Sequence, residues 1–207
     1  MTIFIFLELL VVVVVASAAY LTKIKVEYHK WVKYYCILNA VLGVIATSLA
    51  LNKVSNILVI YLLIWVELFL LFKYFKEISS YVRKVPNIIG LLSIYLILFF
   101  IHFFFEKINS FSPYSLIFEG LVVFCFCFSF FIEQVKAPKE PLIFLNPDFW
   151  FVSAFILYYG GTWLILASSQ YFINDKGLFI YLWDLHNIIS ILKYLAIGVG
   201  FYHIKTL

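Results

Sequence analysis

Charged residues are scarce in this sequence. Only 13% of its 207 residues are Asp, Glu, Lys or Arg, whereas 65% are hydrophobic. Water-soluble domains carry about 25% charged residues, so the composition excludes an ordinary soluble fold. The few charges lie in short clusters between long uncharged runs. This pattern also excludes a disordered tail that binds nucleic acid, and no nucleic-acid partner is expected.

Cysteine and soluble-enzyme motifs are equally rare. Cys36, Cys125 and Cys127 lie in apolar runs, where thiols usually serve as small packing residues. The sequence has no glycine-rich phosphate loop, no nucleophile elbow and no zinc-finger spacing. The segments between the apolar runs are too short for a soluble catalytic domain. The function must therefore reside in membrane helices and their connections.

Seven apolar runs are long enough to cross a membrane. A hydrocarbon core of about 30 Å requires roughly twenty apolar helical residues, because unpaired backbone groups cannot be left in lipid. All five prolines lie in connections or first helical turns. The sequence therefore predicts an all-α polytopic membrane protein, with residues 1–207 forming a single domain, a bundle of seven transmembrane helices. The expected spans are residues 3–22, 34–52, 56–75, 86–105, 114–132, 149–168 and 181–204.

The distribution of Lys and Arg predicts the orientation of the bundle, because cytoplasmic loops carry the excess of basic residues. Eleven of the fifteen lie in the first, third and fifth connections and the C-terminal tail, and three lie on the opposite side. The first span resembles a signal peptide around residues 16–18, but it lacks a basic start and contains Glu8, so we expect it to be retained. The N-terminus is expected outside and the C-terminus in the cytoplasm, in a bacterial cytoplasmic (inner) membrane.

Seven ionisable side chains lie inside the expected spans, where they are costly and usually face the bundle interior. They are Glu8, Glu67, His102, Glu119, Asp184, His186 and Lys193. At about 1.5 Å per residue, Glu67 and Lys193 fall near the midpoints of their spans, and the other five lie toward the outer ends. Glu67 and Lys193 can therefore meet at the centre of the bilayer.

The last span carries a polar stripe. His186, Ser190 and Lys193 lie within about 60° of one another on a helix, with Asn187 and Asp184 on the adjoining sector. The preceding span adds two tyrosines and two glycines to its middle and outer half. We expect an outward-open polar cavity with Glu67 and Lys193 at its floor. Its expected lining is Glu67, Lys193, His186, Ser190, Asn187, Glu119, His102, Asp184, Tyr158 and Tyr159.

A structural role is the alternative for each of these groups. The Lys and Glu at mid-membrane are equally interpretable as a buried pair that fixes helix register. A lone histidine in a membrane more often forms an interhelical hydrogen bond than it binds a metal. Glu8 is shallow enough to be solvated at the interface. No catalytic residue, cofactor or metal is expected, and the weak metal candidates are His102, His186 and Glu119.

Residues 146–150, 158–161 and 182–188, together with Lys193 and Tyr194, form a pattern that resembles that of uncharacterised small seven-helix integral membrane proteins of Bacteroidota. These proteins also carry a glutamate in the third span, as at Glu67 here. The resemblance extends loosely over the whole chain. The resemblance implies that the protein works together with signalling proteins such as histidine kinases, and hence that it has a sensory role.

Three functions are consistent with these features. The favoured one is a sensor or receptor-like protein that signals to a cytoplasmic signalling protein through its basic loops. The second is a small transporter or a pore-forming membrane effector, working as a homo-oligomer, with Glu67 and Lys193 lining the path. The third is an intramembrane metal-dependent hydrolase, an enzyme built on His102, His186 and either Glu119 or Asp184. It is less favoured because seven-helix ceramidase-like hydrolases have a richer set of histidines than these two.

Overall fold

The computed structural model describes residues 3–85, 90, 92–97, 100, 113–138, 142–172 and 176–206. This part of the chain is helical apart from short connections and contains no strand, which confirms the all-α prediction. Its helices are α1 (Ile3–Leu21), α2 (His29–Leu51), α3 (Ile57–Ile78), α4 (Ser80–Arg83), α6 (Pro113–Lys136), the 3-10 helix η1 (Ile143–Leu145), α7 (Pro147–Phe172) and α8 (Lys176–Thr206).

Helices of the length and hydropathy needed to cross a membrane dominate the described part of the chain. Their mean hydropathy lies between 1.3 and 2.6, which indicates a membrane protein. The expected span at 86–105 falls largely outside the described residues, although residues 92–97 are helical. Five segments qualify: Ile3–Leu21, His29–Leu51, Ile57–Ile78, Leu116–Lys136 and Ile180–Ile204.

Several helices are longer than the apolar runs predicted. The helix expected at 34–52 begins at His29, and the helix expected at 181–204 extends from Lys176 to Thr206. Apolar runs mark only the part of a helix that lies in hydrocarbon, whereas backbone hydrogen bonding continues into the polar interface. At the start of α7, the Asp148 backbone N–H donates to Asn146 Oδ1 at 2.8 Å, so Asn146 caps this helix.

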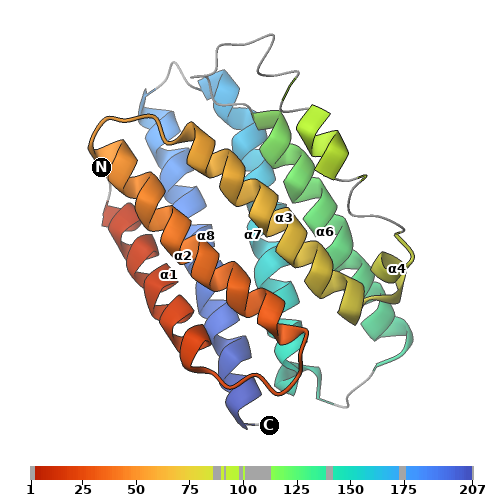
Figure 1. Cartoon of the computed structure of the whole chain (residues 1–207). Helices are drawn as coiled ribbons and strands as arrows, with labels where there is room; N and C mark the ends of the chain where they lie inside the picture. The colour runs from red at the N-terminus through yellow and green to blue at the C-terminus, as the bar shows by residue number, and fades with distance from the viewer. Residues whose placement is uncertain are drawn as a thin grey trace.

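The six long helices form a closed ring. Each of α1, α2, α3, α6, α7 and α8 packs against the next in this order, and α8 packs against α1 (Figure 1). Consecutive helices of the ring run in alternating directions except at two junctions, α3 with α6 and α8 with α1, where the two helices run the same way (Figure 1). The N-terminus consequently lies at one end of the bundle and the C-terminus at the other, and we name the two ends after these termini.

Helical residues 92–97 lie outside the ring. Tyr95 is fully buried and packs with Tyr61 and Ile64 of α3, and Leu116 of α6 packs against the same cluster. This segment therefore covers the outer surface of α3 and α6 and leaves the interior of the ring to the six long helices.

A layer of aromatic rings fills the middle of the bundle on the C-terminal side. It consists of Tyr35, Tyr74, Phe75, Phe151 and Phe155, which are all fully buried. The centroids of neighbouring rings lie 5.3 to 6.3 Å apart, mostly edge to face. Such contacts favour dense packing. We refer to these five side chains as the aromatic layer.

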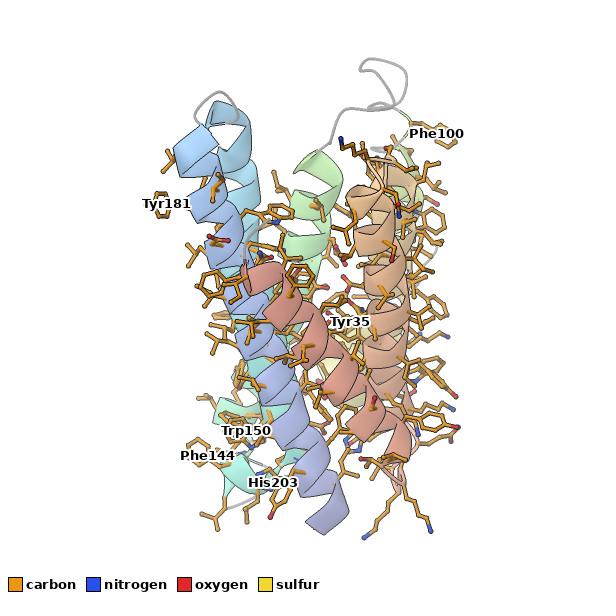
Figure 2. All side chains as sticks on the ribbon, turned by 90° about the vertical axis from the view of Figure 1, so that its left-hand side faces the viewer. Tyr35, Phe100, Phe144, Trp150, Tyr181 and His203 are labelled. Atoms are coloured by element: carbon orange, nitrogen blue, oxygen red, sulfur yellow. The ribbon has the colours of Figure 1, made fainter. Side chains whose placement is uncertain are left out.

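The outer surface carries apolar and aromatic side chains. Figure 2 shows Tyr181 near the N-terminal end and Phe144 and Trp150 near the C-terminal end, with Tyr35 between them. Tyr181 is 75% exposed and Phe144 61% exposed. Aromatic side chains near both ends of an apolar bundle are typical of the two interfaces of a bilayer.

Candidate functional site

A cavity of about 350 Å³ lies inside the ring, and all six long helices line it. It extends from the N-terminal end, where Ile5, Ala50 and Leu116 come from terminal helical turns, to the middle of the bundle at Asn39 and Lys193. This volume is within the range of pockets that hold small molecules. We call it the central cavity.

Two carboxyl groups meet at the floor of the central cavity. The Tyr159 hydroxyl lies 3.0 Å from Glu67 Oε2 and 3.3 Å from Glu119 Oε1. Glu67 is 6% exposed and Glu119 2% exposed, and they come from α3 and α6. A tyrosine hydroxyl has one proton to donate, so it cannot satisfy both carboxyl groups fully. A side-chain hydrogen bond also joins Glu119 to Glu67, which requires one of the two carboxyl groups to carry a proton.

The amine of Lys193 lies nearby on α8. It donates to the Tyr35 hydroxyl at 3.1 Å and lies 3.7, 4.3 and 5.5 Å from the ring centroids of Tyr158, Tyr194 and Tyr35. Aromatic faces stabilise an ammonium ion electrostatically. No carboxylate oxygen of the described residues lies within 4.0 Å of this amine, since the ion pairs found there are His29 with Asp148 and Lys30 with Glu27. Lys193 is therefore enclosed by tyrosines and does not pair directly with Glu67.

The polar stripe on α8 faces this cavity because its members recur every three or four residues. His186, Asn187, Ser190, Lys193 and Tyr194 all line it. A hydrogen bond of 2.9 Å from the Tyr194 hydroxyl to Asn39 Oδ1 fixes the stripe to α2. The continuous helix and the spacing of its polar residues together explain how one face of α8 supplies much of the lining.

Two polar atoms on this face have no hydrogen-bond partner within the described part of the chain. They are Asn187 Nδ2 and His186 Nδ1, and both are buried atoms. Asn187 is only 2% exposed. A buried unpaired donor is destabilising by about 1–3 kcal/mol, so such groups are rare unless a ligand or water completes them. The Trp183 ring stacks on His186 with centroids 5.2 Å apart and also lines the cavity.

The glycines of α7 serve packing. A Cβ atom at Gly160 would lie 3.1 Å from the Phe124 ring on α6, and one at Gly161 would lie 3.0 Å from the Ile189 side chain on α8. α7 continues as a helix through both glycines. The absence of side chains therefore lets α7 approach both neighbours closely.

The structure places most of the predicted cavity residues around the central cavity. Asp184 does not line it, because it points to a different sector of α8, and His102 lies outside the described residues. No group of three or more His, Cys, Asp and Glu side chains within the described residues could hold a metal ion. The predicted residues that do line it are Glu67, Lys193, His186, Ser190, Asn187, Glu119, Tyr158 and Tyr159.

Sequence reasoning missed several lining residues. Glu8, expected at the interface, lines the cavity beside Ser190 and within electrostatic range of Lys193. The sequence could have indicated that Asn39 faces the interior, because an amide inside an apolar span is destabilising unless it is hydrogen-bonded. Trp183 lies near the end of an expected span, where aromatic residues usually form an interfacial belt, and nothing in its spacing distinguishes that role from lining the cavity.

A second polar cluster lies at the C-terminal end and was also missed. Asp148 Oδ1 accepts hydrogen bonds from His29 Nε2 at 3.0 Å and from the Tyr74 hydroxyl at 2.7 Å. Asp148 Oδ2 accepts one from the Tyr28 hydroxyl at 3.0 Å. We call these four residues the Asp148 cluster. They join α7 to α3 and to the start of α2. Three of them, Tyr28, His29 and Asp148, line a second cavity of about 320 Å³ together with other residues of that end.

Comparisons with protein-family models, with curated proteins and with solved structures found no match to this chain. The functional argument therefore depends on the geometry of the two cavities and the layer between them.

Proposed function

We propose that this chain is a membrane sensor or receptor-like protein. The central cavity binds a small ligand that arrives from outside the cell or from the lipid, and the basic C-terminal end passes the signal to a cytoplasmic partner. The observation that carries this proposal is a ligand-sized cavity, lined by all six long helices, that contains buried unpaired polar atoms. The aromatic layer lies below its floor, where Tyr35 contacts both Lys193 and Phe155. Such closure suits a receptor better than an open channel.

The proposed orientation has seven spans, an external N-terminus and a cytoplasmic C-terminus in a bacterial inner membrane. Supporting features are the termini at opposite ends of the bundle (Figure 1) and the 26-residue length of α7, which is sufficient to cross a bilayer. The basic residues gather at the C-terminal end, as the positive-inside rule requires.

Cysteine labelling tests this orientation. A membrane-impermeant maleimide applied to intact cells should label Lys53→Cys, between α2 and α3, and should not label Lys84→Cys until the membrane is opened. The native Cys36, Cys125 and Cys127 lie within helices, and the unsubstituted protein serves as the background control. Labelling of Lys84→Cys alone in intact cells would reverse the proposed orientation.

Signalling requires that the ligand bind two packings of the bundle with different affinity. The groups best placed to respond are at the cavity floor, where one hydroxyl of Tyr159 is shared by Glu67 and Glu119. A ligand that supplies another donor would release Tyr159 from one carboxyl group. Tyr159 lies on α7, and Asp148 lies in the first turn of the same helix. A shift of α7 would therefore change the contacts of the Asp148 cluster at the C-terminal end.

Fluorine NMR of protein labelled with 5-fluorotryptophan tests this coupling. Trp183 lines the central cavity, whereas Trp150 lies at the opposite end, where its indole N–H donates to the Phe144 carbonyl at 2.8 Å (Figure 2). Substitution of each by phenylalanine assigns its resonance. A panel of small amines, carboxylates and alcohols is then titrated into the protein in nanodiscs. The receptor proposal expects at least one compound to move both resonances, and it fails if none moves either.

A small carrier is the second candidate function, and the second cavity favours it. Cavities of about 350 and 320 Å³ lie at opposite ends with buried aromatic rings between them, as in a carrier that opens to each side in turn. Flux of a bound compound into proteoliposomes would favour the carrier, and binding without flux would favour the receptor.

A further inference from the structure

We propose that the ligand of the central cavity is a small organic ammonium ion that also carries an oxygen hydrogen-bond acceptor. This inference rests on the proposed function and specifies the class of its ligand. The features that carry it are an excess of carboxyl groups around the cavity, a lysine amine that is already hydrogen-bonded and enclosed by tyrosines, and a buried amide N–H without an acceptor.

The charge around the cavity is unbalanced. Glu8, Glu67 and Glu119 line it from three different helices, and Lys193 is the one Lys or Arg among its described lining residues. Glu67 and Glu119 are joined by a hydrogen bond and so share a proton, which leaves at most two carboxylate charges facing the one amine. A bound cation would balance the remaining negative charge.

Lys193 does not serve as that cation. Its amine is held by the Tyr35 hydroxyl and lies 3.7 Å from the centre of the Tyr158 ring. The same Tyr158 ring packs against His186, nearer the N-terminal end, with centroids 5.7 Å apart. The ring thus lies between the amine and the upper part of the cavity. It would offer an aromatic face to an incoming ammonium ion.

Asn187 specifies the second feature of the ligand. Its side chain is 2% exposed and lines the cavity, and Nδ2 has no hydrogen-bond acceptor within the described residues. On a helix this residue lies about 9 Å above Lys193, toward the N-terminal end. A hydroxyl or carbonyl oxygen on the ligand would complete this donor while the ammonium group meets the carboxyl groups below.

The walls suit the carbon skeleton of such a ligand. Leu63, Ile64, Val12 and the Trp183 ring contribute apolar surface between the polar groups. Apolar walls with a few placed polar groups are the usual design of sites for small organic molecules. An inorganic cation would leave this surface and Asn187 without a partner.

Three probes that share one phenylethyl group test the charge requirement: 2-phenylethylamine, 2-phenylethanol and 3-phenylpropanoate. Each is titrated into the full-length protein in nanodiscs, and the Trp183 fluorine resonance reports binding. We expect saturable binding of the amine and binding at least tenfold weaker for the alcohol and the carboxylate, since a hydrogen bond to a charged partner usually accounts for tenfold or more. Glu67→Gln should weaken the amine about tenfold, whereas Glu133→Gln, a carboxyl group of the C-terminal end, should not.

A fourth probe, 2-amino-1-phenylethanol, tests the acceptor. It should bind several-fold more tightly than 2-phenylethylamine to the unsubstituted protein, and this advantage should vanish in Asn187→Leu, in which the amine itself still binds. Equal binding of amine and alcohol, or tighter binding of the carboxylate, overturns the ammonium assignment while leaving the receptor proposal intact. Absence of binding by every class of probe overturns both. If 2-amino-1-phenylethanol still binds Asn187→Leu more tightly than 2-phenylethylamine does, Asn187 does not recognise an acceptor on the ligand, and this part of the proposal is wrong.

Discussion

Replacing Tyr74 by phenylalanine removes one hydroxyl group from the Asp148 cluster while preserving the buried ring. The hydroxyl donates to Asp148 Oδ1 at 2.7 Å, and Tyr74 is fully buried. Hydrogen bonds to charged groups contribute about 1.5–3 kcal/mol in soluble proteins, whereas interhelical bonds in membrane proteins average about 0.6 kcal/mol and reach about 1.7 kcal/mol. The short distance and the charged acceptor place Tyr74→Phe near the upper membrane value, at about 1–2 kcal/mol of lost stability.

Asp148→Ala should cost more, because it leaves three donors of the cluster without their acceptor. A buried donor left unpaired costs about 1–3 kcal/mol, so three such donors should together cost at least about 3 kcal/mol. Unfolding in mixed micelles with a denaturing detergent, followed by circular dichroism, measures both losses. Tyr20→Phe at the same end, where Tyr20 is 69% exposed, is the matched control and should change stability by less than about 0.5 kcal/mol. Equal effects of the Tyr74 and Tyr20 substitutions would refute the claim that the cluster holds this end together.

Three further substitutions have defined outcomes. Gly200→Ala should destabilise the fold by about 1–3 kcal/mol in the same unfolding assay, because its Cβ would lie 2.5 Å from the buried Phe151 ring, and a neutral result would contradict this packing. Gly43→Ala has nothing within 4 Å of its Cβ and should stabilise α2 by up to about 1 kcal/mol, so a clear loss would be evidence against the open space described there. Lys193→Met should lower the yield of monodisperse protein or abolish the probe-induced shifts, since it removes the amine bound to Tyr35, and a stable, fully responsive variant would eliminate the polar floor.

The apolar runs predicted the helices well because hydrophobic length is a direct physical requirement of the bilayer. They predicted helix ends poorly, since His29 and the first residues of α8 lie outside the apolar runs yet belong to hydrogen-bonded helices. The ring could not be predicted, because every helix is apolar on most of its surface and its sequence does not specify which neighbours it packs against.

The candidate site was partly predictable for a related reason. A titratable side chain within a span must face protein or water, so Glu67 and Lys193 could be assigned to the interior before their neighbours were known. Their partners could not be deduced, since tyrosine is tolerated both at the interface and in the interior. The enclosure of Lys193 by Tyr35 and Tyr158, in place of a direct pair with Glu67, is therefore visible only in three dimensions.

Filling the central cavity tests most directly whether it is the binding site. Gly43 lines it and has open space at its Cβ position, so the Gly43→Phe side chain would enter the cavity without moving a helix. Val44→Phe, at a neighbouring position that is 40% exposed, is the matched control. We predict that 2-phenylethylamine moves the Trp183 fluorine resonance in the unsubstituted protein and in Val44→Phe, but not in Gly43→Phe. A shift of equal size and midpoint in Gly43→Phe would contradict binding in this cavity.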